Sequence, residues 1–278
     1  MEIQHSMNTG TYVEPSRVTV GQFLDQWLND IVATKVAPST AQVNEHIVRC
    51  HLIPSLRAAS LAKLTSQQVQ VYYVDRLENG RLDRAGGLSH RSVRHHHTTL
   101  HTALQSALKQ GLLGRNVLDA VDTPRSERKE MRTLDEVGLR RIIQAAAETL
   151  YHALFYTALF TGARRSELLA LSWSDIDLDV GGVLIARSVH HLKHGKIVYK
   201  APKTNKSRRH IPLPPSATRV LRMHKDRQQE AFSEIEIPWT EDRLVFGNEV
   251  GGALHPDTVT HARMKLVRGL GLKEHSPA

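Results

Sequence analysis

The sequence of 278 residues lacks the cysteines, the long apolar runs and the N-terminal signal that are typical of disulfide-bonded, membrane-bound or secreted proteins. Its single cysteine, Cys50, excludes a disulfide framework and a thiolate zinc site, and it predicts a reducing compartment. No run approaches the roughly 18 apolar residues that a membrane-spanning helix needs. Residues 1–10 (MEIQHSMNTG) also lack the basic and apolar segments of a secretion signal. We therefore expect a cytoplasmic protein that does not enter a membrane.

Positive charge is what the sequence has in excess, and it is concentrated in one stretch. Lys and Arg number 37 against 28 Asp and Glu, which gives a net charge of +9. Residues 187–228 hold 12 basic residues against the single acidic Asp226, more than the whole excess. Such a stretch is typical of a surface that meets phosphate, so a nucleic acid is the expected partner. A solvated charged hairpin is the alternative interpretation.

Helix signals fill the first part of the chain, and no strand signal interrupts them. Apolar residues recur at three- and four-residue spacing, and Thr19, Thr65 and Ser89 are placed as N-caps. Pro54 is expected to stop the second helix. The predicted helices cover residues 17–32, 40–52, 65–77 and 90–111. We predict an N-terminal lead over 1–16, an α-helical domain over 17–122, a polar linker over 123–130 and a second domain over 131–278.

The second domain mixes helix and strand signals. Helices are predicted over residues 134–148, 150–160, 166–171, 216–231 and 256–269. Short β-type runs occur at 182–186 and 196–199, around the turn-like residues 193–195, and a third run ends near Leu213. The predicted fold class is thus mainly α with a small β-sheet, and the second domain is mixed α/β.

The sharpest local motif is residues 161–177, TGARRSELLALSWSDID. Gly162 allows the chain to turn sharply between two helices. Glu167 follows Arg164 by three residues, so the two side chains share a helix face and the carboxylate can orient the guanidinium. Taken alone, this is also what an ordinary surface ion pair looks like.

A second motif lies in the basic stretch, at residues 201–214, APKTNKSRRHIPLP. Lys203 is placed on a turn that leads into a strand. Its compact, rotatable charge could reach a phosphate or protonate a leaving oxygen. A lysine in a polar turn is, by itself, usually only solvated.

Together the two motifs resemble the tyrosine site-specific recombinases, the phage-type integrases. Residues 161–177 are similar to the first catalytic box of that family, and residues 201–214 to its β-hairpin lysine segment. The resemblance extends over most of residues 17–272. It includes TVGQFLDQWL, APST and LAKLTSQQVQVYY upstream, and LVFGNEVGGALHPDTVTHARMKL downstream. It implies an α-helical core-binding domain followed by a catalytic domain of the DNA breaking-rejoining type.

The resemblance also implies a mechanism and roles for residues. In this family a tyrosine attacks a DNA phosphodiester, and the covalent link conserves the bond energy, so neither ATP nor metal is needed. Arg164 corresponds to the catalytic arginine on the non-bridging oxygens, Lys203 to the lysine that protonates the leaving 5′-oxygen, and Glu167 supports Arg164 from behind. The residues expected to contact DNA without doing chemistry are Arg165, Lys206, Arg208, Arg209, His210, Arg91 and Arg94.

The nucleophile is where this sequence departs from the family pattern. The family completes its site with a His-x-x-Arg box and a tyrosine that follow the lysine hairpin. The six tyrosines here are at 12, 72, 73, 151, 156 and 199, and none follows Lys203. We therefore expect a catalytic domain that is incomplete at its C-terminal end, and a chain that binds DNA without cutting it.

Two other functions remain open at this point. The chain could be a non-catalytic DNA-binding remnant or regulator. It could instead be a metal-dependent nuclease that uses the histidines at 95–97 and 101 with Asp175 and Asp177, although no third ligand or supporting pattern accompanies them. We assign no metal and no cofactor. The expected partner is double-stranded DNA, on which a homo-oligomer could assemble.

Overall fold

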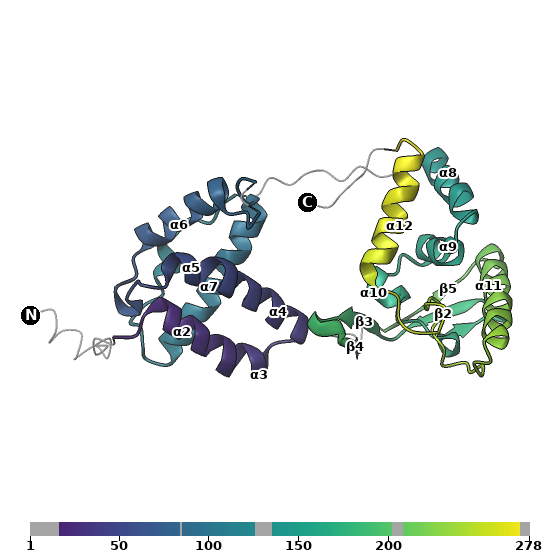
Figure 1. Cartoon of the computed structure of the whole chain (residues 1–278), viewed down its shortest axis with the longest axis horizontal. Coiled ribbons are helices and arrows are strands. Elements are labelled where there is room, and N and C mark those ends of the chain that lie inside the picture. Colours follow the sequence, from purple (N-terminus) through teal and green to yellow (C-terminus); the bar gives the residue numbers. More distant parts are fainter. Residues whose placement is uncertain (1–16, 84, 126–134, 202–207, 273–278) are drawn as a thin grey trace, which may run out of the picture. The chain divides into compact units, whose positions relative to one another are not determined.

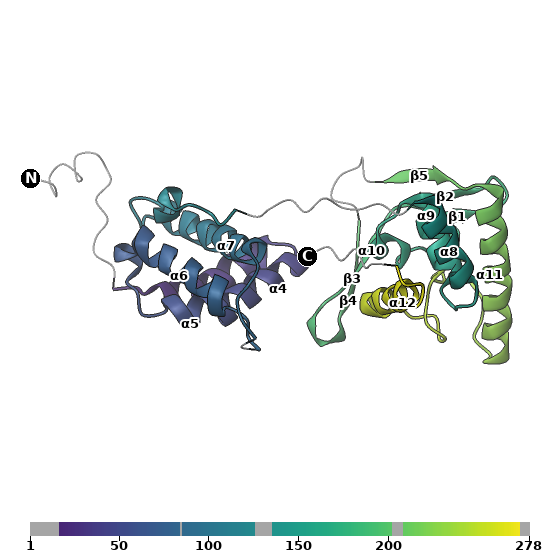
Figure 2. The ribbon, with the colours of Figure 1, turned by 90° about the horizontal axis from the view of Figure 1, so that it is seen from above.

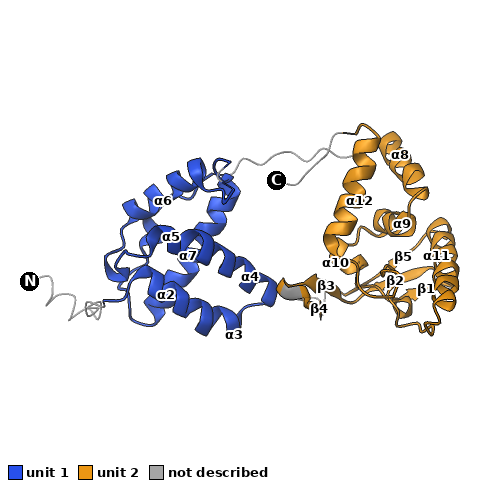
Figure 3. Ribbon diagram, viewed as in Figure 1, with its two compact units in different colours: residues 1–129 blue, residues 130–278 orange. Residues whose placement is uncertain are grey.

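A computed structural model describes residues 17–83, 85–125, 135–201 and 208–272 of the chain. The chain divides into two compact units, unit 1 from Met1 to Lys129 and unit 2 from Glu130 to Ala278 (Figure 3). The predicted fold class, mainly helical with small antiparallel sheets, is confirmed. No helix in these described ranges is long and apolar enough to cross a membrane.

Unit 1 is built from helices alone, as far as its described residues go (Figure 1). They are α2 (Val20–Trp27), α3 (Ala33–Lys35), α4 (Pro38–Ile47), α5 (Ile53–Leu56), α6 (Ser66–Asn79) and α7 (His90–Lys109). Two π-helical turns, Leu28–Val32 and Val48–Leu52, join α2 to α3 and α4 to α5, and short 3-10 turns cover Leu61–Lys63 and Val117–Ala120. Residues from all the longer helices meet in one apolar core, in which Leu100 and Leu104 of α7 are fully buried.

The predicted N-caps of three helices are confirmed. The Thr19 side chain accepts from the backbone N–H of Gln22, whose side chain accepts from the Thr19 N–H, and Thr65 forms the same reciprocal pair with Gln68. Ser89 accepts from the backbone N–H three residues on. These local hydrogen bonds satisfy N–H groups that a helix start otherwise leaves unpaired, which is why the sequence alone locates them.

The expectation that Pro54 stops the second helix is wrong. Helix α4 widens into the π-helical turn Val48–Leu52, and the Ile53 N–H donates to the carbonyl of Val48, five residues back. Pro54 then occupies the first turn of α5, where the missing N–H of a proline costs little. The helical path therefore continues through the proline by changing its hydrogen-bond spacing.

Unit 2 combines helices with two small antiparallel sheets. Its helices are α8 (Glu136–Ala147), α9 (His152–Thr161), α10 (Arg165–Leu168), α11 (Pro215–Glu234) and α12 (Pro256–Gly269). Its strands are β1 (Ile176–Asp177), β2 (Gly182–Ile185), β3 (Ser188–His191), β4 (Ile197–Lys200) and β5 (Arg209–Pro212). Figure 1 shows α11 running alongside the three-stranded sheet, while α9 contacts α8, α10 and α11.

The two strand runs predicted at 182–186 and 196–199 form strands but do not pair with each other. Strand β2 lies between β1 and β5, with Val183 opposite Ile211, and β4 pairs with β3. Strand β3 carries no strand signal in the sequence, because Val189 is its only apolar residue and no apolar alternation results. The β3–β4 hairpin extends away from the rest of unit 2 (Figure 2).

The core of unit 2 fixes the position of α10. Leu168, Leu169 and Trp173 are buried together with residues of β2 and α11. The Trp173 indole N–H also donates to the Gln228 side chain of α11, at 2.7 Å. The C-terminal part of the first motif is therefore anchored in the core of unit 2, while its N-terminal end lies at the surface.

Candidate functional site

The first motif begins with a reversal of the chain between α9 and α10. Gly162 ends α9 in the left-handed conformation, with φ of 57°, and its N–H donates to the carbonyl of Ala158. Residues with a Cβ avoid this conformation, so glycine suits the position. Arg164 comes two residues later and is the N-cap of α10. The turn thus puts Arg164 at the exposed start of a helix whose other end is buried.

Glu167 joins two arginines that come from different parts of unit 2. Its Oε2 accepts from the backbone N–H of Arg164 at 2.8 Å, and its Oε1 accepts from Nη1 of the same arginine at 2.9 Å. Arg209, the first residue of β5, grips both oxygens, with Nη2 to Oε2 at 2.9 Å and Nη1 to Oε1 at 3.2 Å. The contact between Glu167 and Arg164 that the sequence predicted is present, and Arg209 completes a cluster of three side chains.

The electrostatics of the cluster keep Glu167 ionised. Burial by itself would raise the pKa of this carboxyl group. The hydrogen bonds from Arg209 and from the backbone and side chain of Arg164 outweigh burial and lower the pKa of Glu167 to about 2. Two guanidinium groups and one carboxylate leave the cluster with a net positive charge, which suits an anionic ligand.

The two arginines differ in how far they face the solvent. The side chain of Arg164 is 75% exposed, that of Arg209 is 32% exposed, and Glu167 is buried between them at 9%. Arg164 therefore presents most of its guanidinium outward while one edge is held by the carboxylate. A planar cation oriented in this way can accept two oxygens of a phosphate side by side.

Arg165, next in sequence to Arg164, is directed elsewhere. Its Nη1 donates to the carbonyl of Pro256 at 3.1 Å and also contacts the Thr260 hydroxyl. Both partners belong to the N-terminal part of α12, so Arg165 links α10 to that helix. The DNA contact that the sequence predicted for Arg165 stays a prediction.

The other residues predicted to contact DNA are spread over both units. Arg208 and His210 flank Arg209 and are exposed, and Arg91 and Arg94 are exposed on the first turns of α7 in unit 1. Lys203 and Lys206 lie outside the described residues. The roles of all six residues stay predictions, since the structure contains no nucleic acid.

Sequence reasoning placed Arg209 on the DNA and missed its link to Glu167. A signal for the link was available in β5, where burial alternates along Arg209, His210 and Ile211. Ile211 packs against the apolar core, and side chains two residues apart share one face of a strand. Arg209 must then point the same way as Ile211, toward α10, while His210 points out.

The carboxylates proposed for a metal nuclease are occupied by protein donors. Asp175 Oδ2 accepts from the Ser172 N–H at 2.9 Å and from Arg187 at 2.8 Å, and Asp177 Oδ1 accepts from the N–H groups of Asp179 and Val180. Within the described part of the chain, no three His, Cys, Asp or Glu side chains are grouped so that they could hold a metal ion. The arrangement therefore gives the nuclease alternative no support.

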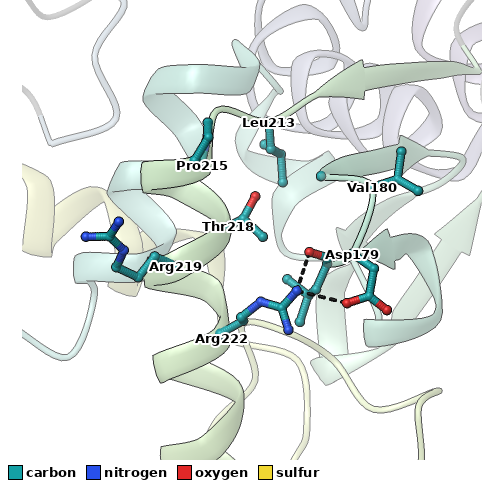
Figure 4. A pocket seen from close by; sticks show the side chains of 9 residues that line it. Asp179, Val180, Leu213, Pro215, Thr218, Arg219 and Arg222 are labelled. Carbon is teal, nitrogen blue, oxygen red and sulfur yellow. Dashed lines mark hydrogen bonds and ion pairs between the residues drawn. The ribbon is translucent and has the colours of Figure 1, made fainter.

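A separate pocket of about 360 Å³ lies between the turn after β1 and the first half of α11 (Figure 4). Leu178, Val180, Leu213 and Thr218 are among its lining residues. On one side of it, Arg222 donates to the Leu178 carbonyl and to the exposed carboxylate of Asp179. Arg164, Glu167 and Arg209 do not line this pocket, so it is no part of the arginine cluster.

Known proteins resemble the chain along most of its length. An integrase of Streptomyces ambofaciens is 27% identical over 99% of this chain and 70% of that protein. A protein of Caldanaerobacter subterraneus subsp. tengcongensis named "Tyrosine recombinase XerC-like" is 25% identical over 98% of this chain and 72% of that protein.

Solved structures share the fold. The Tn1549 transposon integrase in complex with circular intermediate DNA superposes with a TM-score of 0.74 over 93% of this chain and 80% of that one, at 16% identity. A lambda integrase dimer bound to a core site superposes with a TM-score of 0.65 over 93% and 81%, at 19% identity.

Family profiles match both units. The profile of the phage integrase N-terminal SAM-like domain matches residues 19–77, within unit 1. The profile of the phage integrase family matches residues 132–277, which include the arginine cluster and make up more than half of the sequence. The chain therefore belongs to the phage integrase family, that of the tyrosine recombinases.

Proposed function

We propose that this chain binds double-stranded DNA in site-specific recombination and that Arg164 receives a DNA phosphate. The observation that carries the proposal is the exposed guanidinium of Arg164, held along one edge by the buried carboxylate of Glu167. The orientation of the cation is fixed before any ligand arrives, so little conformational freedom is lost when a phosphate binds.

The chemistry of such a site is charge neutralisation on a phosphodiester. Negative charge shifts onto the non-bridging oxygens in the transition state, and a planar guanidinium can donate to two of them. We assign this role to Arg164 and the role of its support to Glu167. Lys203, the proposed donor of a proton to the leaving 5′-oxygen, rests on the resemblance of residues 201–214 alone.

The partner is proposed to be duplex DNA, contacted by several copies of the chain. The 12 basic residues at 187–228 supply the charge that a phosphate backbone attracts. The Tn1549 integrase is described in complex with DNA, and lambda integrase is described both as a dimer and as a tetramer on DNA. Arg91, Arg94, Arg165, Lys206, Arg208 and His210 are proposed backbone contacts.

Replacing Arg164 with alanine tests the site. We expect the affinity for a fluorescent duplex to fall roughly fivefold to tenfold, and the slope of log affinity against log salt to become shallower by about one. Fluorescence anisotropy over a salt series measures both. Arg140→Ala is the matched control, because Arg140 is an equally exposed arginine of the same unit that pairs with Glu136 on its own helix. If the two variants bind DNA equally well, Arg164 has no such role.

A second candidate function, DNA binding without strand cleavage, is favoured by the tyrosines. None of the six tyrosines within these 278 residues follows Lys203, and in the family the nucleophilic tyrosine follows the lysine hairpin. We expect no covalent complex when this chain is incubated with a nicked duplex that traps phosphotyrosyl intermediates. Denaturing gel electrophoresis detects such a complex, and its appearance would show that a tyrosine within the chain attacks DNA.

A further inference from the structure

We propose that Arg209 is a positioning residue that acts on Arg164 through Glu167. This inference rests on the proposed function, because it takes Arg164 to be the group that meets the phosphate. It assigns to Arg209 a task different from the direct DNA contact that its sequence neighbourhood predicts.

The first argument is geometric. Arg209 contacts both oxygens of Glu167 with two different nitrogens, at 2.9 and 3.2 Å, so the carboxylate cannot rotate without breaking one of the contacts. Arg209 is itself held in the sheet, where it lies opposite Ile185 in the β2–β5 register. The carboxylate oxygen that accepts from Arg164 Nη1 is therefore fixed from the sheet side.

The second argument is electrostatic. Without Arg209, the charge of Glu167 would cancel that of Arg164, and a carboxylate would lie beside the approaching phosphate. With Arg209 present, the cluster carries one net positive charge, and the pKa of Glu167 stays far below neutral pH. Arg209 thus allows the same carboxylate to orient Arg164 without neutralising the site.

The third argument is the difference in exposure. An arginine that gripped DNA directly would be expected to face the solvent as Arg164 does, whose side chain is 75% exposed. The side chain of Arg209 is 32% exposed, and its guanidinium contacts a buried carboxylate. Arg208, the preceding residue, is exposed. The two neighbouring arginines therefore offer a matched pair for an experiment: they carry equal charge, and Arg209 is the one that contacts Glu167.

A double-mutant cycle on DNA affinity tests the proposal with the full chain. We expect Arg209→Ala to weaken binding of a fluorescent duplex about threefold to tenfold on its own. In the Arg164→Ala background, Arg209→Ala should lower the DNA affinity less than about twofold, because the residue through which Arg209 acts is absent. If the two losses multiply, Arg209 contacts DNA independently and the proposal is overturned.

Two further variants control for charge and for folding. Arg208→Ala should weaken binding by the same factor in both backgrounds, which shows that the assay detects independent contacts. Arg209→Lys keeps the charge but cannot grip two oxygens, so its affinity should lie between that of the unmodified chain and that of Arg209→Ala. Full recovery in the lysine variant would mean that charge alone matters and would contradict the positioning role. If Arg164→Ala alone has no effect on DNA affinity, the proposed function fails. Losses of affinity that multiply in the double variant, by contrast, overturn only the role given to Arg209.

Discussion

Acidification from about pH 7 to about pH 5 is expected to lower the free energy of unfolding of unit 1 by about 2 kcal/mol through His96 alone. The ring of this histidine lies on α7 and is 3% exposed. Burial, together with the nearby charges of His51, Arg76, His46 and His95, lowers the pKa of His96 to about 3. The unfolded chain takes up a proton below its ordinary pKa of 6.5 and the folded chain does not, so stability falls between about pH 6.5 and 3.

The surroundings of His96 explain why its ring stays unprotonated in the folded state. Its Nδ1 lies 2.8 Å from the Tyr72 hydroxyl, and burial raises the pKa of Tyr72, so the phenol stays neutral and offers the ring no negative charge. The ring of His51 lies 4.6 Å away, and burial lowers the pKa of that histidine as well. The buried Nδ1 of His51 has no hydrogen-bond partner within the described structure. A proton on His96 would add a positive charge near that of Arg76, which itself helps to lower the pKa of His96.

Urea unfolding at the two pH values measures the effect. Trp27 is the only tryptophan of residues 1–129, so its fluorine NMR signal in fluorotryptophan-labelled protein reports on unit 1 separately from unit 2. The variant His96→Gln cannot be protonated and should lose about 2 kcal/mol less stability on acidification than the unmodified chain. His95→Gln, at the exposed neighbouring position, removes only the smallest of the named charges that lower the pKa of His96, so most of the pH effect should remain. Equal losses in the His96 variant and the unmodified chain would contradict the assignment.

The parts of the fold that the sequence predicted are those governed by local hydrogen bonds. Thr19, Thr65 and Ser89 each accept from a backbone N–H three residues on, so a short window contains both partners. Helix α12 was predicted over the residues it occupies, 256–269. Apart from the helix expected to stop at Pro54, what the sequence did not reveal depends on partners far along the chain. The pairing of β2 with β5 joins residues nearly 30 positions apart, such as Val183 and Ile211, so a window around residues 182–199 contains only one of the two strands.

At the candidate site too, the sequence predicted the contact between near neighbours and did not reveal the contact between distant residues. Arg164 and Glu167 lie three residues apart on one helix, and the sequence predicted their contact. Arg209 is 42 residues from Glu167. The alternation in β5 gives the face of the strand on which Arg209 lies, but its carboxylate partner follows from strand pairing, which a local pattern does not reveal. Among so many basic residues in the same stretch, nothing in the composition distinguishes an arginine that grips a buried carboxylate from one that faces solvent.

Arg187, like Arg209, binds a largely buried carboxylate. Replacing Arg187 with alanine is expected to lower the free energy of unfolding of unit 2 by about 3 kcal/mol. Its Nε donates to the Ala170 carbonyl at 2.8 Å, and its Nη2 donates to Asp175 and contacts the Ser172 hydroxyl. Asp175 is only 10% exposed, so its carboxylate would lose its cation where water reaches it poorly. The segment after α10, on which the position of Arg164 depends, would lose its main polar anchor.

Arg222→Ala is the matched control for this prediction. Arg222 makes the same two kinds of contact, to a carbonyl, that of Leu178, and to a carboxylate, that of Asp179 (Figure 4). The carboxylate of Asp179 is 91% exposed, however, so water replaces the lost arginine and the cost should stay below about 1 kcal/mol. Urea unfolding, followed through the fluorine signal of Trp173, compares the two variants. Equal destabilisation would mean that burial of Asp175 does not set the strength of the Arg187 anchor.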